Sequence, residues 1–266
     1  MKKQFSAQHC RRIYEEARTY LLTFKDVDQP LLNRYLDEWQ ENSPESIEDL
    51  LEGLLSSASN KQGMPNTIGK VENLKTILCD FNPTKILKEF DSDWKQVFNK
   101  IKQEHHPKGN LDINNGKSYW VIFSKAVISG AIFLQKFSNV TEFNDFVRNF
   151  YHDEYTRVAL PLLLSQEIDG IGFALACDFL KENGYPEFAK PDVHIKKIFN
   201  GLGLSDSNDD YEVFKDVIRF SELVNELPYR VDKPFWLVGS GNLYMDGIRI
   251  LTNRDQFISK VKMDFL

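Results

Sequence analysis

A glycine-rich turn between two apolar segments is the first feature of the sequence that could bind a ligand. Gly170 and Gly172 flank one aliphatic residue, Ile171, and apolar residues at 176, 179 and 180 follow them. Glycine adopts positive φ and lets another backbone come close, and the amide groups at the start of the next helix favour a phosphate. The pattern therefore indicates a helical hairpin that could grip a nucleic-acid backbone. A turn between two packed helices with no ligand is the alternative.

A second segment of interest is centred on Asp192, which lies 18 residues after Ala174. Asp192 follows Pro191 and directly precedes the segment 193–200, so its side chain is well placed to cap a helix. The segment then closes on Leu-Gly-Leu at 202–204. A glycine hairpin, a short loop, an Asp-x-His sequence and an apolar helix thus follow one another in a defined order.

This order resembles the helix-hairpin-helix DNA glycosylase superfamily, which includes endonuclease III and 8-oxoguanine glycosylase. The core of the resemblance covers residues 168–204. Weaker matches lie at 229–239, which is similar to the family's late helix, and at 47–77, which is similar to its early helix pair with a DNA-facing connection. The first forty or so residues and the tail after Tyr244 fall outside the resemblance.

The resemblance implies that Asp192 is the essential catalytic carboxylate. Cleavage of an N-glycosidic bond passes through a sugar with oxocarbenium character, so a nearby carboxylate can stabilise positive charge and orient or deprotonate water. Capping and catalysis are compatible, since one oxygen can hold the helix while the other faces the substrate. A purely structural cap is the alternative.

Ala174 stands where related enzymes that also cut the DNA strand carry a lysine, two residues past the second glycine of the hairpin. In those enzymes the lysine amine forms a Schiff base with the sugar. Lys181 lies on the same helical face, but about 10 Å further along at 1.5 Å per residue, which is too far to substitute. The resemblance therefore predicts a monofunctional glycosylase that uses water, with lyase activity absent or weak.

The same resemblance implies further site residues. The DNA backbone would be bound by the hairpin and by lysines near Asp192, with a solvated surface lysine as the alternative: Gly170, Ile171, Gly172, Ala174, Lys190 and Lys196. Candidates for the pocket of a flipped base, or for filling the gap that it leaves, are Ser59, Asn60, Phe173 and Trp236, followed by Phe235 and Trp120. Burial in the core is the alternative for each aromatic residue. We expect His194 to pack beneath the Asp192 loop.

The composition limits how such a chain could meet DNA. Thirty-three Lys and Arg against 39 Asp and Glu give a net charge of −6. That balance argues against coating of nucleic acid or anionic membrane by bulk charge, but it allows a local site built from backbone amides and a few lysines. We expect a monomer that binds double-stranded DNA carrying a flipped, altered base, with modest affinity and on one face.

No iron–sulfur cluster or other metal centre is expected. Cys10, Cys79 and Cys177 lie far apart, which rules out a four-cysteine cluster or zinc site built by this chain alone and fits a reducing compartment. The adjacent pair 105–106 is better explained as two loop histidines than as a metal site, because no third ligand lies nearby. The resemblance leaves room for a monovalent cation at the hairpin.

The hydrophobic pattern also bears on location. The longest apolar stretch, around 126–134, is too short to span a bilayer, and residues 1–10 contain no apolar signal core. We therefore expect an intracellular protein, either cytoplasmic and nucleoid-associated or nuclear.

Apolar residues recur mostly at helical spacing, so we expect helices to position the candidate site residues. Residues 13–24 and 47–55 show it clearly, and capping signals precede 47, 84 and 143. Gly241-Asn242 and Asp246-Gly247 bracket alternating residues that suggest a short strand or hairpin. We predict a mostly α fold with two helical lobes around a cleft, a helix-hairpin-helix motif and a short β hairpin near the C-terminus.

The predicted domain organisation is one glycosylase-like unit over 1–266. Its approximate lobes are 70–165 and 30–69 plus 166–245, with a C-terminal extension at 246–266.

Three functions of different classes are consistent with these observations. The leading hypothesis is a DNA glycosylase of the base excision repair type; oxidised purines, alkylated purines and phage-modified bases all remain possible targets. The second is a non-catalytic DNA-binding or scaffold protein that retains the fold within a larger DNA-processing or defence assembly. The third is a helical protein that never contacts nucleic acid.

Overall fold

The computed structural model describes residues 6–265 and divides the chain into two compact units. The inserted unit is Ser43–Asn183, and the terminal unit combines Met1–Asn42 with Gly184–Leu266. Helices make up most of both units, and one short β hairpin lies in the terminal unit, so the predicted mostly α class is confirmed. None of the helices in the described range is long and apolar enough to cross a membrane.

The unit boundaries differ from the predicted lobes. Residues 43–69 and 166–183 pack with 70–165 rather than with the C-terminal half, because α10 packs against both α3 and α9 and α3 packs against α7. Residues 1–5 and 266 of the predicted single unit lie outside the described residues.

The inserted unit contains seven α-helices of at least seven residues and three shorter pieces within the described range. In chain order they are α3 (Ile47–Ser59), α4 (Pro65–Ile68), η2 (Val71–Leu74), η3 (Cys79–Phe81), α5 (Pro83–Glu89), α6 (Trp94–Glu104), α7 (Tyr119–Leu134), α8 (Val140–Arg148), α9 (Glu154–Glu167) and α10 (Phe173–Glu182).

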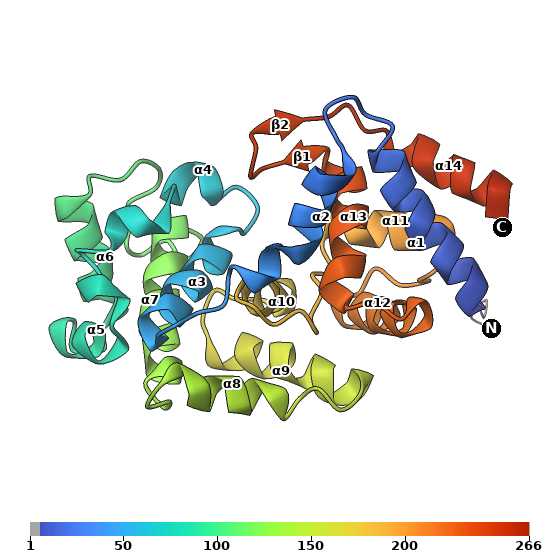
Figure 1. Cartoon of the computed structure of the whole chain (residues 1–266). Helices are drawn as coiled ribbons and strands as arrows, with labels where there is room; N and C mark the ends of the chain where they lie inside the picture. The colour runs from blue at the N-terminus through green and yellow to red at the C-terminus, as the bar shows by residue number, and fades with distance from the viewer. Residues whose placement is uncertain (1–5, 266) are drawn as a thin grey trace. The chain divides into compact units, whose positions relative to one another are not determined.

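Helix α7 forms the centre of the inserted unit. It is the most apolar helix of the chain, and it packs against α3, α5 and α6 (Figure 1). Gly130 on α7 lets α3 approach, since a Cβ there would lie 2.9 Å from Leu54 Cδ2. At the other end of the helix, the Trp120 indole is 1% exposed and donates to the Lys108 carbonyl at 2.8 Å. Trp120 is therefore a core residue.

The predicted capping signals mark real helix starts. Ser46 forms a capping box with Asp49 at the start of α3, and Asn82 caps α5 through the Lys85 amide. The helix expected to start near 143 begins earlier, because the cap of α8 is Asn139, whose side chain accepts from the Glu142 amide.

The terminal unit is built from both ends of the chain. Its elements are α1 (Ala7–Leu21), α2 (Gln29–Asp37), η1 (Glu38–Gln40), α11 (Val193–Leu202), α12 (Asp210–Val224), α13 (Pro228–Ser240), β1 (Asn242–Leu243), β2 (Ile248–Arg249) and α14 (Arg254–Phe265).

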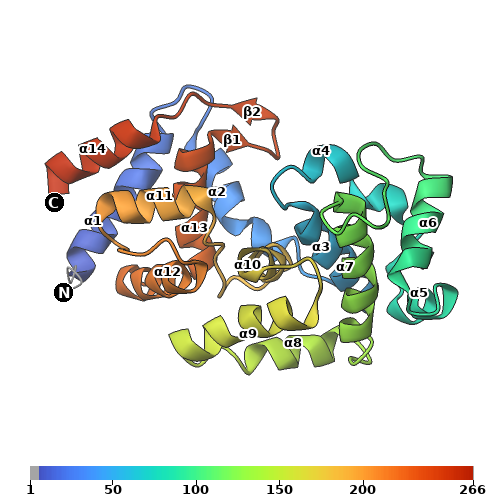
Figure 2. The same ribbon diagram turned by 180° about the vertical axis from the view of Figure 1, so that it is seen from behind.

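Helix α13 is the centre of this unit and packs against α1, α2, α11 and α12, as Figure 2 shows from behind. Pro234 lies inside α13, where its missing N–H leaves the Arg230 carbonyl without its helical donor. The Tyr14 hydroxyl on α1 donates to that carbonyl at 3.1 Å. The N-terminal helix, which lies outside the family resemblance, thus completes the hydrogen bonding of the central helix.

The predicted β hairpin follows α13. Strands β1 and β2 are antiparallel, with Asn242 paired to Arg249 and Leu243 to Ile248. Tyr35 of α2 fixes the turn, because its hydroxyl accepts from the Met245 amide at 2.9 Å and donates to Asp246 Oδ2 at 3.1 Å. Burial, followed by the hydrogen bond to Asp246, raises the pKa of Tyr35 to about 12, so the hydroxyl keeps its proton at physiological pH.

Candidate functional site

The predicted glycine hairpin connects α9 to α10 in the inserted unit. Gly170 has φ +79, and a Cβ there would lie 2.8 Å from Ile122 Cγ2 and 3.2 Å from the Ile122 carbonyl oxygen of α7. The Asp169 amide donates to Ser129 Oγ at 2.9 Å, and Ile171 is 3% exposed. The turn is therefore anchored on α7, and its first glycine is required by the fold.

Gly172, in contrast, is not explained by packing within the chain. Its backbone is extended at φ −85 and ψ 173, the residue is exposed, and a Cβ there would meet no atom within 4 Å. Gly172 is the N-cap of α10, and no side chain of the described residues caps that helix. The start of α10 is thus open from outside, with Phe173 and Ala174 part-buried in its first turn.

Lys181, near the end of α10, is held inside the inserted unit. Its side chain is 4% exposed, and Nζ lies 3.1 Å from Glu182 Oε1. An amine that is buried and paired with a carboxylate cannot reach a sugar outside the unit. The ion pair supports the prediction, made from distance along the helix, that Lys181 does not replace the missing lysine at 174.

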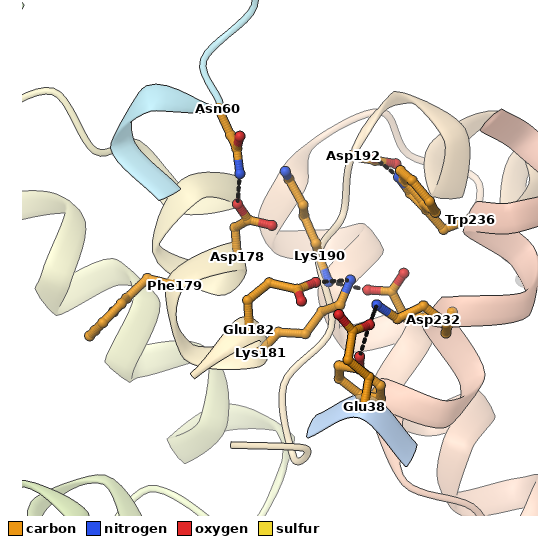
Figure 3. Close-up of polar contacts among 12 residues, drawn as sticks. Glu38, Asn60, Asp178, Phe179, Lys181, Glu182, Lys190, Asp192, Asp232 and Trp236 are labelled. Carbon is orange, nitrogen blue, oxygen red and sulfur yellow. Dashed lines mark hydrogen bonds and ion pairs between the residues drawn. The ribbon is translucent and has the colours of Figure 1, made fainter. Parts of the chain in front are cut away.

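The two residues predicted to fill a gap in the duplex differ in their exposure. Ser59 is 6% exposed, and its hydroxyl donates to the Ser56 carbonyl of its own helix at 2.7 Å. Asn60 is exposed and follows the last residue of α3, where its Nδ2 donates to Asp178 Oδ2 of α10 at 2.9 Å (Figure 3). Of the two, Asn60 has the accessible side chain.

Asp192 lies in the terminal unit as the N-cap of α11. Its Oδ1 accepts from the amides of His194 at 2.8 Å and Ile195 at 3.1 Å, which is the predicted capping role. Its Oδ2 accepts from Trp236 Nε1 of α13 at 3.1 Å (Figure 3). Both carboxylate oxygens therefore have fixed partners, and the residue is only part-buried.

Trp236, predicted as a pocket residue, is thus brought directly to the candidate catalytic carboxylate. Its ring is part-buried and lies edge-to-face between two others, with His194 at 6.2 Å and Tyr244 at 5.7 Å between centroids. Phe235, the neighbouring candidate, is 0% exposed and packs in the core of the terminal unit.

His194 packs closely on α13 at Gly239. A Cβ at Gly239 would lie 2.6 Å from His194 Cβ, so the glycine lets the start of α11 pack on α13. The buried His194 Nδ1 has no hydrogen-bond partner among the described residues.

The two lysines predicted to bind phosphates have different contacts within the terminal unit. Lys196 forms an ion pair with Asp210 at the start of α12, so a phosphate would have to compete with that carboxylate. The backbone amide of Lys190 donates to Asp232 Oδ2 at 2.7 Å, which fixes the loop before Asp192 onto α13 (Figure 3).

Sequence reasoning did not find a charged cluster around Lys233, which includes Tyr244, a ring neighbour of Trp236. Lys233 Nζ is 3.1 Å from Glu38 Oε2 and 2.7 Å from the Tyr244 hydroxyl, and the same glutamate oxygen accepts from Tyr244 and from Tyr229. Lys233 is 1% exposed. Lys233 directly before the apolar end of the segment 229–239 was the available signal, but its partner Glu38 is 195 positions away.

Comparisons with known proteins agree with this architecture at the level of fold. No family model matches the sequence, and no curated protein matches it. A crystal structure of Methanocaldococcus jannaschii 8-oxoguanine glycosylase/lyase in complex with 15mer DNA containing 8-oxoguanine is similar, with a TM-score of 0.53 and 16% identity over 87% of this chain and 99% of that one. A further structure of the 8-oxoguanine DNA glycosylase of M. jannaschii gives a TM-score of 0.51 at 16% identity, over 88% and 96% of the two chains.

The chain therefore has the same fold as these two structures, in agreement with the predicted mostly α architecture. At this identity the similarity establishes the fold, and function has to be argued from the site.

Proposed function

We propose that the protein is a monofunctional DNA glycosylase of the base excision repair type, with Asp192 as its catalytic carboxylate. The observation that carries the proposal is the placement of Asp192. It caps α11, at the position to which the family resemblance assigns the catalytic aspartate, and both of its oxygens have fixed donors. A carboxylate held in one orientation stabilises developing charge without having to reorganise during the reaction.

The proposed chemistry is hydrolysis of the bond between the sugar C1′ and the base nitrogen. The bond breaks with its electron pair leaving on the base, and the sugar gains oxocarbenium character. Asp192 stabilises that positive charge, and water adds to C1′ while one of its protons passes to the carboxylate, which then releases it to neutralise the departed base anion. The products are a free base and an intact strand with an abasic site.

The absence of strand cleavage follows from the residues of α10. Ala174 has no nucleophile, and Lys181 is buried against Glu182, so no described residue of that helix offers an accessible amine near the hairpin. Water is then the remaining nucleophile for the sugar.

DNA binding is assigned to the hairpin on the basis of Gly172. The fold does not require glycine there, yet the missing side chain leaves the first turn of α10 open to a phosphate. A few amide contacts of this kind suit a chain whose net charge is −6.

A panel of duplex oligonucleotides, each with one altered base, tests the proposal. The panel begins with 8-oxoguanine, the base named for the glycosylases of the two similar structures. It continues with alkylated purines and phage-modified bases. Strands are cleaved by hot alkali after incubation, and a parallel sample is treated with borohydride. The proposal expects cleavage of one substrate only after alkali, without a trapped protein–DNA adduct.

The non-catalytic DNA-binding alternative is favoured by one observation, the alanine at 174 in place of a lysine. It expects DNA retention in a gel-shift assay without release of any base across the panel. A borohydride-trapped adduct would instead overturn the monofunctional assignment.

A further inference from the structure

We propose that Trp236 is a positioning residue for Asp192, and that Tyr244, anchored by Glu38 and Lys233, holds Trp236 in place. The inference rests on the proposed function, because the orientation of Asp192 matters to the reaction only if its carboxylate performs the chemistry.

The two ends of the Asp192 carboxylate are held by different parts of the terminal unit. The amides of His194 and Ile195 on α11 fix Oδ1, and the Trp236 indole on α13 fixes Oδ2. Donors on two helices define the plane of the carboxylate, whereas the cap alone fixes only one oxygen. A group that stabilises charge at a reacting carbon gains from such a defined orientation.

The Trp236 ring is itself restrained on two edges. His194 and Tyr244 both meet it edge-to-face, with interplanar angles of 80° and 77°. This arrangement is the favoured one for aromatic pairs, and it limits rotation of the indole about its side-chain torsions.

Tyr244, which is 39% exposed, is restrained in turn by its contacts with the buried Lys233 and the part-buried Glu38. Its hydroxyl accepts from Lys233 and donates to Glu38, and its ring packs edge-to-face on Tyr35 at 5.4 Å. The Lys233 ammonium also lies 5.2 Å from the Tyr244 ring centroid. Because Lys233 is 1% exposed, moving Tyr244 would disturb a buried ion pair, which is costly. Because the Tyr244 ring contacts the Trp236 ring, the fixed position of Tyr244 limits movement of the indole.

Trp120 provides a matched contrast within the same chain. Its indole also donates one hydrogen bond, at 2.8 Å, but the acceptor is the Lys108 carbonyl of a loop. Replacing either tryptophan by phenylalanine removes one indole hydrogen bond and one ring, and only Trp236 is connected to a carboxylate assigned to the chemistry.

Single-turnover excision of the substrate found in the panel tests the inference. The protein concentration is varied to obtain a plateau rate and a half-saturating concentration, and thermal unfolding is followed in parallel. Trp236→Phe is expected to lower the plateau rate about tenfold, the effect of losing a hydrogen bond to a charged group. The half-saturating concentration should stay within about twofold of wild type, because a positioning residue acts on the rate, whereas loss of a ring that lines the base pocket would raise that concentration.

Two further variants separate positioning from folding. Replacing Trp236 with β-(3-benzothienyl)alanine keeps the bicyclic shape but replaces N–H with sulfur, and it should lower the plateau rate as Trp236→Phe does. Trp120→Phe should lower the unfolding temperature and leave the plateau rate unchanged. Tyr244→Phe should lower the plateau rate by less than Trp236→Phe, because the ring contact remains.

A plateau rate equal to wild type in both Trp236 variants would overturn the positioning role. A fall that appears in Trp236→Phe but not in the benzothienyl variant would also overturn it, because packing would then be the cause. An Asp192→Asn variant that excises bases at the wild-type rate is a different outcome, which rejects the proposed function and the positioning role together.

Discussion

Helix α10 begins at Gly172 with no side-chain cap, whereas helix α11 begins at Asp192, whose carboxylate accepts two of the amides in its first turn. The first start has an exposed glycine with open space where a Cβ would be. The second has both carboxylate oxygens engaged by the protein. The same local feature, a helix N-terminus, therefore has no side-chain cap in one unit and is capped by a carboxylate in the other.

The contrast separates two tasks that a glycosylase has to perform. Backbone binding needs donors that are available to DNA, so the α10 amides must not be capped by the protein's own oxygens. Base excision needs a carboxylate whose position does not change, so Asp192 benefits from being tied to the α11 amides and to Trp236. Changing either start should affect one task and spare the other.

The largest effect is expected from Asp192→Asn. The amide keeps an oxygen that can cap α11, but it has no negative charge and is not a base, so excision should fall by about 10³-fold. DNA affinity and the unfolding temperature should stay close to wild type. Excision is measured in single-turnover assays and affinity by fluorescence anisotropy. Wild-type activity in this variant would remove Asp192 from the mechanism.

Gly172→Asp converts the open helix start into a closed one. The backbone at φ −85 and ψ 173 suits an N-cap aspartate, so stability should be unchanged or slightly higher. The carboxylate would occupy the α10 amides and repel phosphate, so affinity for duplex DNA should fall about tenfold or more. Gly172→Ser is the matched control, because it caps the helix without charge and should weaken binding less. Unchanged affinity in Gly172→Asp would exclude this helix start from the DNA interface.

Gly170→Ala tests the glycine that the fold itself requires. The positive φ of +79 and the close Ile122 carbonyl should make this change destabilising by about 1–3 kcal/mol. Urea unfolding measures the loss in the free energy of unfolding. Gly172→Ser is the comparison variant and should show no such loss. If Gly170→Ala were as stable as wild type, the turn would not be anchored on α7 in the way described.

The smallest effect is expected at a third helix start, where Asp153 caps α9. Hydrogen bonds, first of all from the Thr156 amide, lower the pKa of Asp153 below its usual value. The ionised cap therefore contributes stability above the unfolded-state pKa, and this contribution is lost as the pH falls through the folded-state pKa. Asp153→Asn should lower the unfolding temperature slightly at pH 7 and not at strongly acidic pH, with excision unaffected. If Asp153→Asn also lost excision, the loss in Asp192→Asn could be explained by damage to the fold and not by removal of a catalytic carboxylate.

Local signals in the sequence were sufficient for the fold class and for the centre of each candidate site. Periodic apolar residues, capping residues and the two glycines act over a few positions, so they predicted helices, the hairpin and the Asp192 cap. The interaction of Trp236 with Asp192 spans 44 positions, and that of Lys233 with Glu38 spans 195, so no local pattern could reveal either. The unit boundaries were misplaced for the same reason, because the packing of α10 on α3 depends on contacts between distant segments.

The division of tasks is tested most directly by comparing Gly172→Asp with Asp192→Asn in one single-turnover titration against the modified duplex. The account predicts that Gly172→Asp raises the half-saturating protein concentration and reaches the wild-type plateau rate. Asp192→Asn should keep the half-saturating concentration and lose the plateau rate. If both variants changed the same parameter, the open start of α10 and the closed start of α11 would not have separate roles.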